Sequence, residues 1–190
     1  IWITYKSVIQ GELDYLKPVV MFEIGARSLS EPYAMNKVKS LVEENFPAIQ
    51  TSVVDSEIAT AVAGKTFLEK VFLLHELFSV AGHGANANRK SRHLYDLYQM
   101  MDKDFAIAAV KDDELWENIR HHREIFTSVK DMDYTPDVRK RIVLIPREDI
   151  ISVWEKDYAE MLVNMIYGSN KPTFNQIMEK MQVLQDRFRE

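Results

Sequence analysis

The sequence predicts an α+β protein that is predominantly α-helical. Residues 1–54 contain short runs rich in β-branched and aromatic side chains, which favour strands. Residues 55–190 place apolar side chains three and four positions apart, which favours helices with a buried face. We therefore expect a strand-containing part in residues 1–54, followed by an α-helical domain in residues 55–190.

Three strands and one helix are predicted in the first part. The strands cover residues 1–5, 19–24 and 48–54, and the helix covers residues 35–44. Glu23 interrupts the apolar run of the second strand. Because side chains alternate along a strand, Glu23 shares a face with Val19 and Met21. It is either a solvent-facing edge residue or a carboxylate available for chemistry.

A helix is predicted to open the second part, with Asp55 or Ser56 as its N-cap. Residues 66–78 are apolar nearly all round, so we expect this stretch to be buried. Its thin polar stripe consists of Lys65, Glu69 and Glu76.

Lys70 lies away from this polar stripe. Its neighbours at helical spacing include Phe67 and Leu74, and burying an unpaired ammonium among apolar side chains is costly. Lys70 must therefore lie against an anion, shift its pKa, or extend its long side chain to solvent.

A second helix is predicted from Arg92 to Met101, after a glycine- and asparagine-containing loop at residues 82–88 that we interpret as a surface hinge. Arg92, His93 and Asp96 share one polar face of this helix. The simplest interpretation of that face is an ion pair in water between Arg92 and Asp96. Such a pair contributes only a few tenths of a kcal/mol.

Capping signals predict three further helices. Asp112 or Asp113 begins the first, Asp149 begins the second, and a capping box of Thr173 and Gln176 begins the last. The apolar residues that follow each signal repeat at helical spacing.

The composition excludes several classes of protein. The chain has 190 residues, a formal net charge of −5 and no cysteine, so disulfides and thiolate metal sites are excluded and a general nucleic-acid-binding surface is disfavoured. There is neither a bilayer-spanning apolar run nor a signal peptide, so we expect no membrane association and a cytoplasmic location. The sequence begins at Ile1, inside a predicted strand and without Met, so we interpret it as a fragment.

The stretch from Thr66 to Tyr98 resembles a known family. The pattern T-F-L-E-K-x-x-x-L-H-E, then a loop, then R-H-x-Y-D-L-Y, is similar to the third and fourth motifs of the AbiEii/AbiGii toxin nucleotidyltransferases. These belong to the DNA polymerase β-like nucleotidyltransferase superfamily and include toxins of toxin–antitoxin and phage-defence systems. A later pattern, W-E-K-D-Y-x-x-M from Trp154, extends the likeness from about Met21 to the C-terminus.

The resemblance implies roles for particular residues. Lys70 would be catalytic and bind the phosphates of a nucleoside triphosphate, and Asp96 would be the catalytic acid of the fourth motif. Arg92 would pair with Asp96 or approach phosphate, and Glu23 would be a metal-binding acid. Many family members carry Asp where this chain has His93.

The resemblance also implies a reaction and exposes a gap. The reaction would be Mg²⁺-dependent transfer of nucleotides from a nucleoside triphosphate to an acceptor, RNA and particularly tRNA, with an antitoxin protein as partner. In residues 1–54 the resemblance implies the C-terminal strands of the nucleotidyltransferase α/β domain, which is therefore incomplete here. Family members hold the triphosphate and Mg²⁺ with a helix-start G-[GS] motif followed by a strand D-x-D motif, and this arrangement is absent here. The D-x-D at residues 131–133 lies in a polar linker, which we interpret as a loop. We therefore expect this chain alone to be inactive and to hold no tightly bound cofactor.

Two alternatives stay open. A small-molecule nucleotidyltransferase shares the chemistry and differs only in its acceptor. A non-catalytic helical protein-interaction module would retain the motifs only as packing. If Lys70 and Asp96 point into one cleft beside Glu23, the enzyme is favoured; if they face apart into solvent, the interaction module is favoured.

Overall fold

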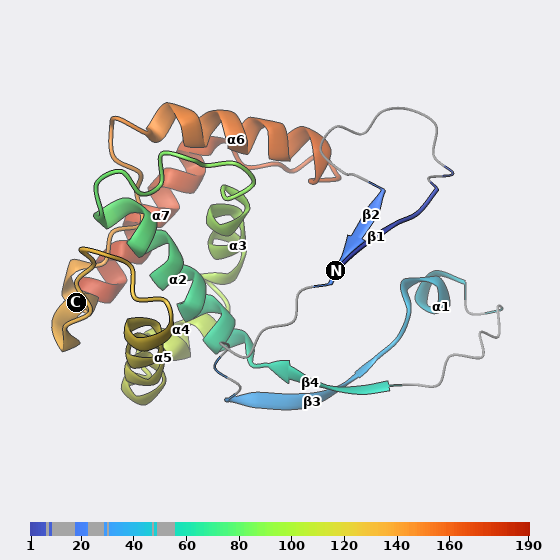
Figure 1. Cartoon of the computed structure of the whole chain (residues 1–190), viewed down its shortest axis with the longest axis horizontal. Helices are drawn as coiled ribbons and strands as arrows, with labels where there is room; N and C mark the ends of the chain where they lie inside the picture. The colour runs from blue at the N-terminus through green and yellow to red at the C-terminus, as the bar shows by residue number, and fades with distance from the viewer. Residues whose placement is uncertain (7, 9–17, 23–28, 30, 47, 49–55) are drawn as a thin grey trace.

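The computed structural model describes residues 1–6, 8, 18–22, 29, 31–46, 48 and 56–190. The helices that follow residue 62 gather on one side of the described molecule, and two small ribbons of strands and the short helix Leu41–Asn45 lie on the other (Figure 1). Because most of the described secondary structure is helical, the predicted α+β, predominantly helical class is confirmed.

Each ribbon consists of two antiparallel strands. The strands are β1 Trp2–Thr4 with β2 Val19–Met21, and β3 Tyr33–Val38 with β4 Ser56–Ala61. Trp2 lies opposite Met21 in the first ribbon, and Tyr33 lies opposite Ala61 in the second. Strands are thus found inside the first two predicted ranges, whereas residues 49–54 of the third lie outside the described residues.

The helices follow in chain order: α1 Leu41–Asn45, α2 Ala63–Ser79, α3 Arg92–Met100, α4 Asp104–Val110, α5 Asp113–Phe126, the 3-10 helix η1 Pro136–Arg141, α6 Ile151–Asn164 and α7 Phe174–Arg189. Helix α2 is the longest of these and packs against α3, α4 and α5. In the described part of the chain, no helix is long and apolar enough to cross a bilayer.

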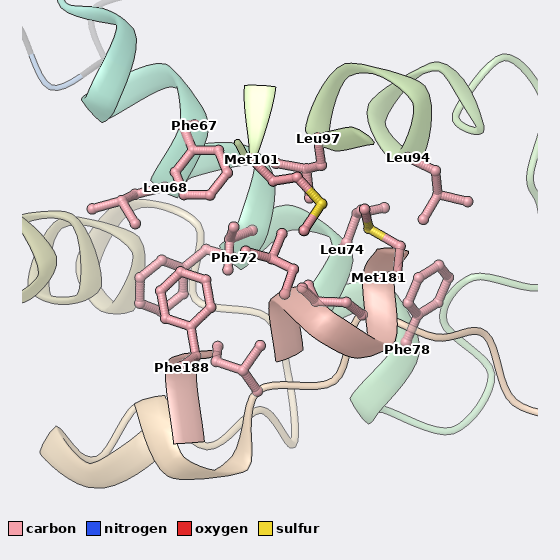
Figure 2. Packing of buried hydrophobic residues seen from close by; sticks show 14 of the residues in the cluster. Phe67, Leu68, Phe72, Leu74, Phe78, Leu94, Leu97, Met101, Met181 and Phe188 are labelled. Carbon is pink, nitrogen blue, oxygen red and sulfur yellow. The ribbon is translucent and has the colours of Figure 1, made fainter. Parts of the chain in front are cut away.

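The hydrophobic core forms around α2 (Figure 2). The Phe72 ring lies 4.4 Å from the ring of Trp116 on α5, and Trp116 lies 5.4 Å from Phe188 on α7. Helix α3 contributes Leu94 and Leu97, which are fully buried. Further fully buried residues of α2 are Phe67, Leu68, Val71 and Leu74. The predicted burial of this helix is confirmed.

The ribbon of β3 and β4 corrects two predictions. The helix predicted over residues 35–44 is wrong, because Tyr33–Val38 is a strand and only Leu41–Asn45 is helical. The N-cap predicted at Ser56 is also wrong, because Ser56 belongs to β4 and α2 begins at Ala63. Pairing between strands far apart in sequence overrides local helical spacing in this segment. The domain division between residues 54 and 55 stays a prediction.

Capping signals were accurate at two of the later helices. Asp112 caps α5, since its carboxylate accepts the backbone N–H of Leu115 at 2.9 Å. Thr173 and Gln176 form the predicted capping box of α7. Both signals act within one helical turn, so the surrounding fold does not alter them.

The prediction for α6 is wrong in its cap. Its N-cap residue is Ile150, which makes no side-chain capping bond, and Asp149 instead pairs with Arg147. The interpretation of residues 131–133 as a loop is confirmed, because they join α5 to η1 outside any helix or strand.

Candidate functional site

Lys70 and Asp96 meet at the junction of α2 and α3. The Lys70 ammonium donates to Oδ2 of Asp96 at 2.8 Å and lies 3.4 Å from Nδ1 of His93. The Lys70 side chain is 22% exposed and that of Asp96 is 39% exposed. Of the three outcomes open to Lys70, the structure therefore has the first, in which the ammonium lies against an anion.

Packing between the two helices creates this pair. Leu74 lies one turn after Lys70 on α2, and it is buried in the same cluster as Leu94 and Leu97 of α3. These leucines hold the helices together, so the polar side chain of Asp96 is brought to the ammonium at the edge of the contact. Among the described ion pairs, none joins Asp96 to Arg92, so the intrahelical pair is not the one that forms.

His93 is neutral at physiological pH. Burial lowers its pKa to about 4, and the positive charges of Lys70 and Arg92 act in the same direction. An ammonium group can only donate, so the neighbouring Nδ1 of His93 accepts. The imidazole thus completes a three-residue cluster with Lys70 and Asp96.

A cleft of about 460 Å³ lies beside this cluster. Its polar wall includes Arg89, Lys90, Arg92 and His93, and Asn88 lies next to them. Its apolar wall is formed by Met21, Leu73 and Leu77. Because the described lining residues include three cations and no acid, the cleft is suited to an anion with an attached apolar or planar group.

The loop before α3 is fixed at the cleft by α6. The Asp157 carboxylate accepts the backbone N–H groups of Arg89 and Ser91 at 2.6 and 2.9 Å. Trp154 donates its indole N–H to the carbonyl of Gly84 at 2.8 Å. Gly84 has φ +73°, and a Cβ there would lie 2.5 Å from the Leu77 carbonyl oxygen. The interpretation of residues 82–88 as a surface hinge stays a prediction.

A buried charged cluster that the sequence did not reveal joins α2 to α5. The Glu76 carboxylate accepts from Nε of Arg123 and from the hydroxyl of Tyr134, both at 2.8 Å. Glu76 is 4% exposed, so this member of the predicted polar stripe is buried. Burial and the Glu76 carboxylate raise the pKa of Tyr134. Because α2 is apolar nearly all round, an acid on it is expected to need a cationic partner. That partner, Arg123, lies 47 residues away in the sequence, so the local pattern cannot identify it.

His75 is a second neutral histidine in the core. Its Nδ1 accepts the backbone N–H of Val143 at 3.1 Å and lies 2.6 Å from the Ser79 hydroxyl. Burial lowers its pKa to about 4. The role of His75 is to hold the segment after η1 against α2, away from the cleft.

The described residues are suited to binding phosphate but do not form a metal site. The cationic cleft fits phosphate oxygens, which Lys and Arg bind well. In the described ranges, no group of three or more His, Cys, Asp or Glu residues is arranged to hold a metal ion. Glu23, the predicted metal-binding acid, lies outside the described residues.

The comparison with protein families decides the identity of the chain. The model of the AbiEii family, described as nucleotidyl transferase AbiEii toxin of a type IV toxin–antitoxin system, matches residues 1–180. This chain belongs to the AbiEii nucleotidyltransferase toxin family. The match contains Lys70, Arg92 and Asp96, and the family description implies an antitoxin as counterpart. No curated protein and no solved structure matches the chain.

Proposed function

We propose that this AbiEii protein transfers nucleotides from a nucleoside triphosphate to RNA, with tRNA ends as acceptor, in a Mg²⁺-dependent reaction. The observation that carries the proposal is the Lys70–Asp96 pair, whose neighbour His93 lines a cationic cleft. Family membership supports the reaction class, and the choice of acceptor and metal is the proposal's own.

Lys70 would bind a phosphate of the triphosphate. Its ammonium has three donors, of which one is directed to Asp96 and one lies near His93, so one donor is left for a phosphate oxygen. Pairing with Asp96 does not oppose this role, because a partly exposed ion pair is weak and adapts at little cost. Arg92 adds a second phosphate-binding group on the cleft wall.

Asp96 would orient Lys70 and the attacking hydroxyl of the acceptor. A carboxylate at this place holds the ammonium in position and has oxygen lone pairs left to accept a hydrogen bond from a hydroxyl. Nucleotidyl transfer depends chiefly on such positioning and on stabilising negative charge on the phosphates. Replacement of the carboxylate by an amide is therefore expected to disturb both functions.

Magnesium, when bound, would neutralise charge on the phosphates. The described residues do not contain its ligand set, and Glu23 alone would not make one. We infer that the catalytic protein also needs the helix-start G-[GS] and strand D-x-D motifs, and that residues 1–190 without them transfer no nucleotide.

The test is nucleotide transfer by the protein expressed from the natural start codon of its reading frame. Each labelled nucleoside triphosphate is incubated with the protein, Mg²⁺ and total tRNA, and labelled RNA is measured. Lys70→Ala and Asp96→Asn are expected to lower transfer by about 100-fold or more. A loss of this size is typical when one group that stabilises charge in a transition state is removed.

Matched controls come from the ion pair between Lys180 and Asp102. The nitrogen–oxygen distance in this pair is also 2.8 Å, but the pair joins α7 to the segment after α3. Lys180→Ala and Asp102→Asn are expected to retain transfer. The proposal is refuted if the folded wild-type protein transfers no nucleotide, or if the variants of Lys70 and Asp96 transfer as well as the controls.

A non-catalytic interaction module is the second candidate. The exposed apolar residues of the β3–β4 ribbon favour it, since Met35 is 57% exposed and Ile58 is 49% exposed. Absence of transfer with every triphosphate, combined with stable binding of the co-expressed antitoxin, would make this the better description.

A further inference from the structure

His93 both contacts Lys70 and lines the cleft. Its Nδ1 is 3.4 Å from the Lys70 ammonium, and His93 is also one of the residues that line the cleft. Since an ammonium has no lone pair, Nδ1 of the neutral ring must present its own lone pair to Lys70. The ring proton then belongs to Nε2, so the imidazole has one remaining donor to offer to a ligand.

Burial, and then the charges around His93, keep the ring neutral by lowering its pKa. Lys70 faces it from α2, Arg92 and Asp96 lie on its own helix, and Lys90 lies on the preceding loop. Three of these four groups are cations, and each opposes addition of a proton to the ring.

A neutral residue at position 93 changes what the cleft can bind. A carboxylate there would repel phosphate oxygens and would require a bridging cation. The imidazole removes this repulsion and adds a donor beside Arg89, Lys90 and Arg92. The resulting wall can satisfy several phosphate oxygens with nitrogen donors alone.

We propose that His93 is a phosphate-binding residue whose Nε2–H donates to an oxygen of the triphosphate group, and that this cleft binds the group without a divalent metal. The identity of the ligand rests on the proposed function. Metal would then be needed for transfer, while binding of the phosphate chain would proceed in its absence. His93 acts on the ligand directly and Lys70 fixes its tautomer.

The first experiment measures binding of inorganic tripolyphosphate by calorimetry in EDTA at pH 7.5. The wild-type protein is expected to bind. His93→Gln keeps an N–H group close to the place of Nε2 and is expected to bind within about threefold of wild type. His93→Asn has a shorter side chain, and His93→Asp adds a negative charge; both are expected to weaken binding at least tenfold, or about 1.4 kcal/mol.

Lys180→Gln is the control for non-specific attraction, because it removes a positive charge on α7, outside the cleft. It is expected to bind tripolyphosphate as the wild type does. The proposal is overturned if wild-type binding requires Mg²⁺, if His93→Asp binds as tightly as wild type, or if Lys180→Gln weakens binding as much as His93→Asp. Circular dichroism of each variant verifies that the fold is retained.

The second experiment reads the tautomer itself. In ¹⁵N-labelled protein, the imidazole nitrogens of His93 are expected to show a protonated Nε2 and an unprotonated Nδ1 at pH 7. Added tripolyphosphate should shift the Nε2 resonance more than the Nδ1 resonance. A proton on Nδ1, or an unchanged Nε2 resonance at saturating tripolyphosphate, would overturn the assignment.

These results separate the two proposals. Nucleotide transfer by a protein whose tripolyphosphate binding requires metal would leave the proposed function standing and refute metal-free binding. Metal-free binding that depends on His93, without transfer to any acceptor, would support this inference and refute the proposed function.

Discussion

The helical bundle and the two ribbons differ in what holds them together. In the bundle, Phe72 is fully buried between helices that are distant in sequence, whereas Met35 on β3 is 57% exposed. All described side chains of β3 and β4 are exposed. A two-stranded ribbon in water is only marginally stable by itself, while a buried aromatic core stabilises its surroundings strongly. Stability is therefore concentrated in the bundle, and the Lys70–Asp96 pair lies on that rigid part.

The largest effect on the free energy of unfolding is expected from a substitution at the centre of the helical bundle. Phe72→Ala removes a fully buried ring that packs against Trp116, and it should lower the free energy of unfolding by about 3–5 kcal/mol. Urea denaturation followed by circular dichroism measures this change. A loss smaller than about 1 kcal/mol, well below the usual cost of such a cavity, would show that the bundle is not the stable part of the molecule.

The second-largest effect on stability is expected from the buried cluster of Glu76, Arg123 and Tyr134. Glu76→Ala leaves the guanidinium of Arg123 buried without its carboxylate, and we expect a loss of about 3 kcal/mol in the same measurement. Glu117→Ala is the matched control, because Glu117 pairs with Arg120 but its side chain is 44% exposed. Its loss should stay below about 1 kcal/mol. Equal effects of the two substitutions would contradict the importance of burial.

Stability should fall as the pH is lowered from about 6.5 toward 4. The folded protein depresses the pKa of His75 to about 4 from 6.5, so the unfolded chain takes up the proton first. The stabilisation is therefore complete above 6.5 and is lost through this window, by about 2–3 kcal/mol for buried His75. His93 acts in the same direction.

Urea denaturation at a series of pH values measures this loss. His75→Gln should flatten the pH dependence. His121, whose side chain is 65% exposed, provides the control, since His121→Gln should leave the dependence unchanged. A wild-type stability that does not vary between pH 6.5 and 4 would rule out the assignment.

The smallest effect is expected in the ribbon. Ile58→Ala on β4 removes an apolar side chain that is 49% exposed, so the free energy of unfolding should change by less than about 0.5 kcal/mol. The comparison between ribbon and bundle would fail if this substitution destabilised the protein by more than about 2 kcal/mol, since only a buried side chain gives such a loss.

Lys70 and Asp96 illustrate how far the sequence leads toward the site. Helical spacing identified Lys70 as a lysine among apolar neighbours, for which an anionic partner was one of three outcomes, and the motifs indicated Asp96 through family resemblance. That the two side chains meet, and that His93 lies beside them, follows from the packing of α2 on α3. Their partnership spans 26 residues, and no local pattern specifies a contact of that separation.

The sequence by itself determined the features that depend on one helical turn or one helix face. The cap of α5, predicted at Asp112 or Asp113, the capping box at Thr173 and the burial of α2 are of this kind, because their partners lie within a few residues or because periodicity reveals them. Tertiary structure alone decided the pairing of Tyr33 with Ala61 and the burial of Glu76 against Arg123. Both join segments distant in sequence, and the free energy of such contacts exists only once the chain has brought those segments together.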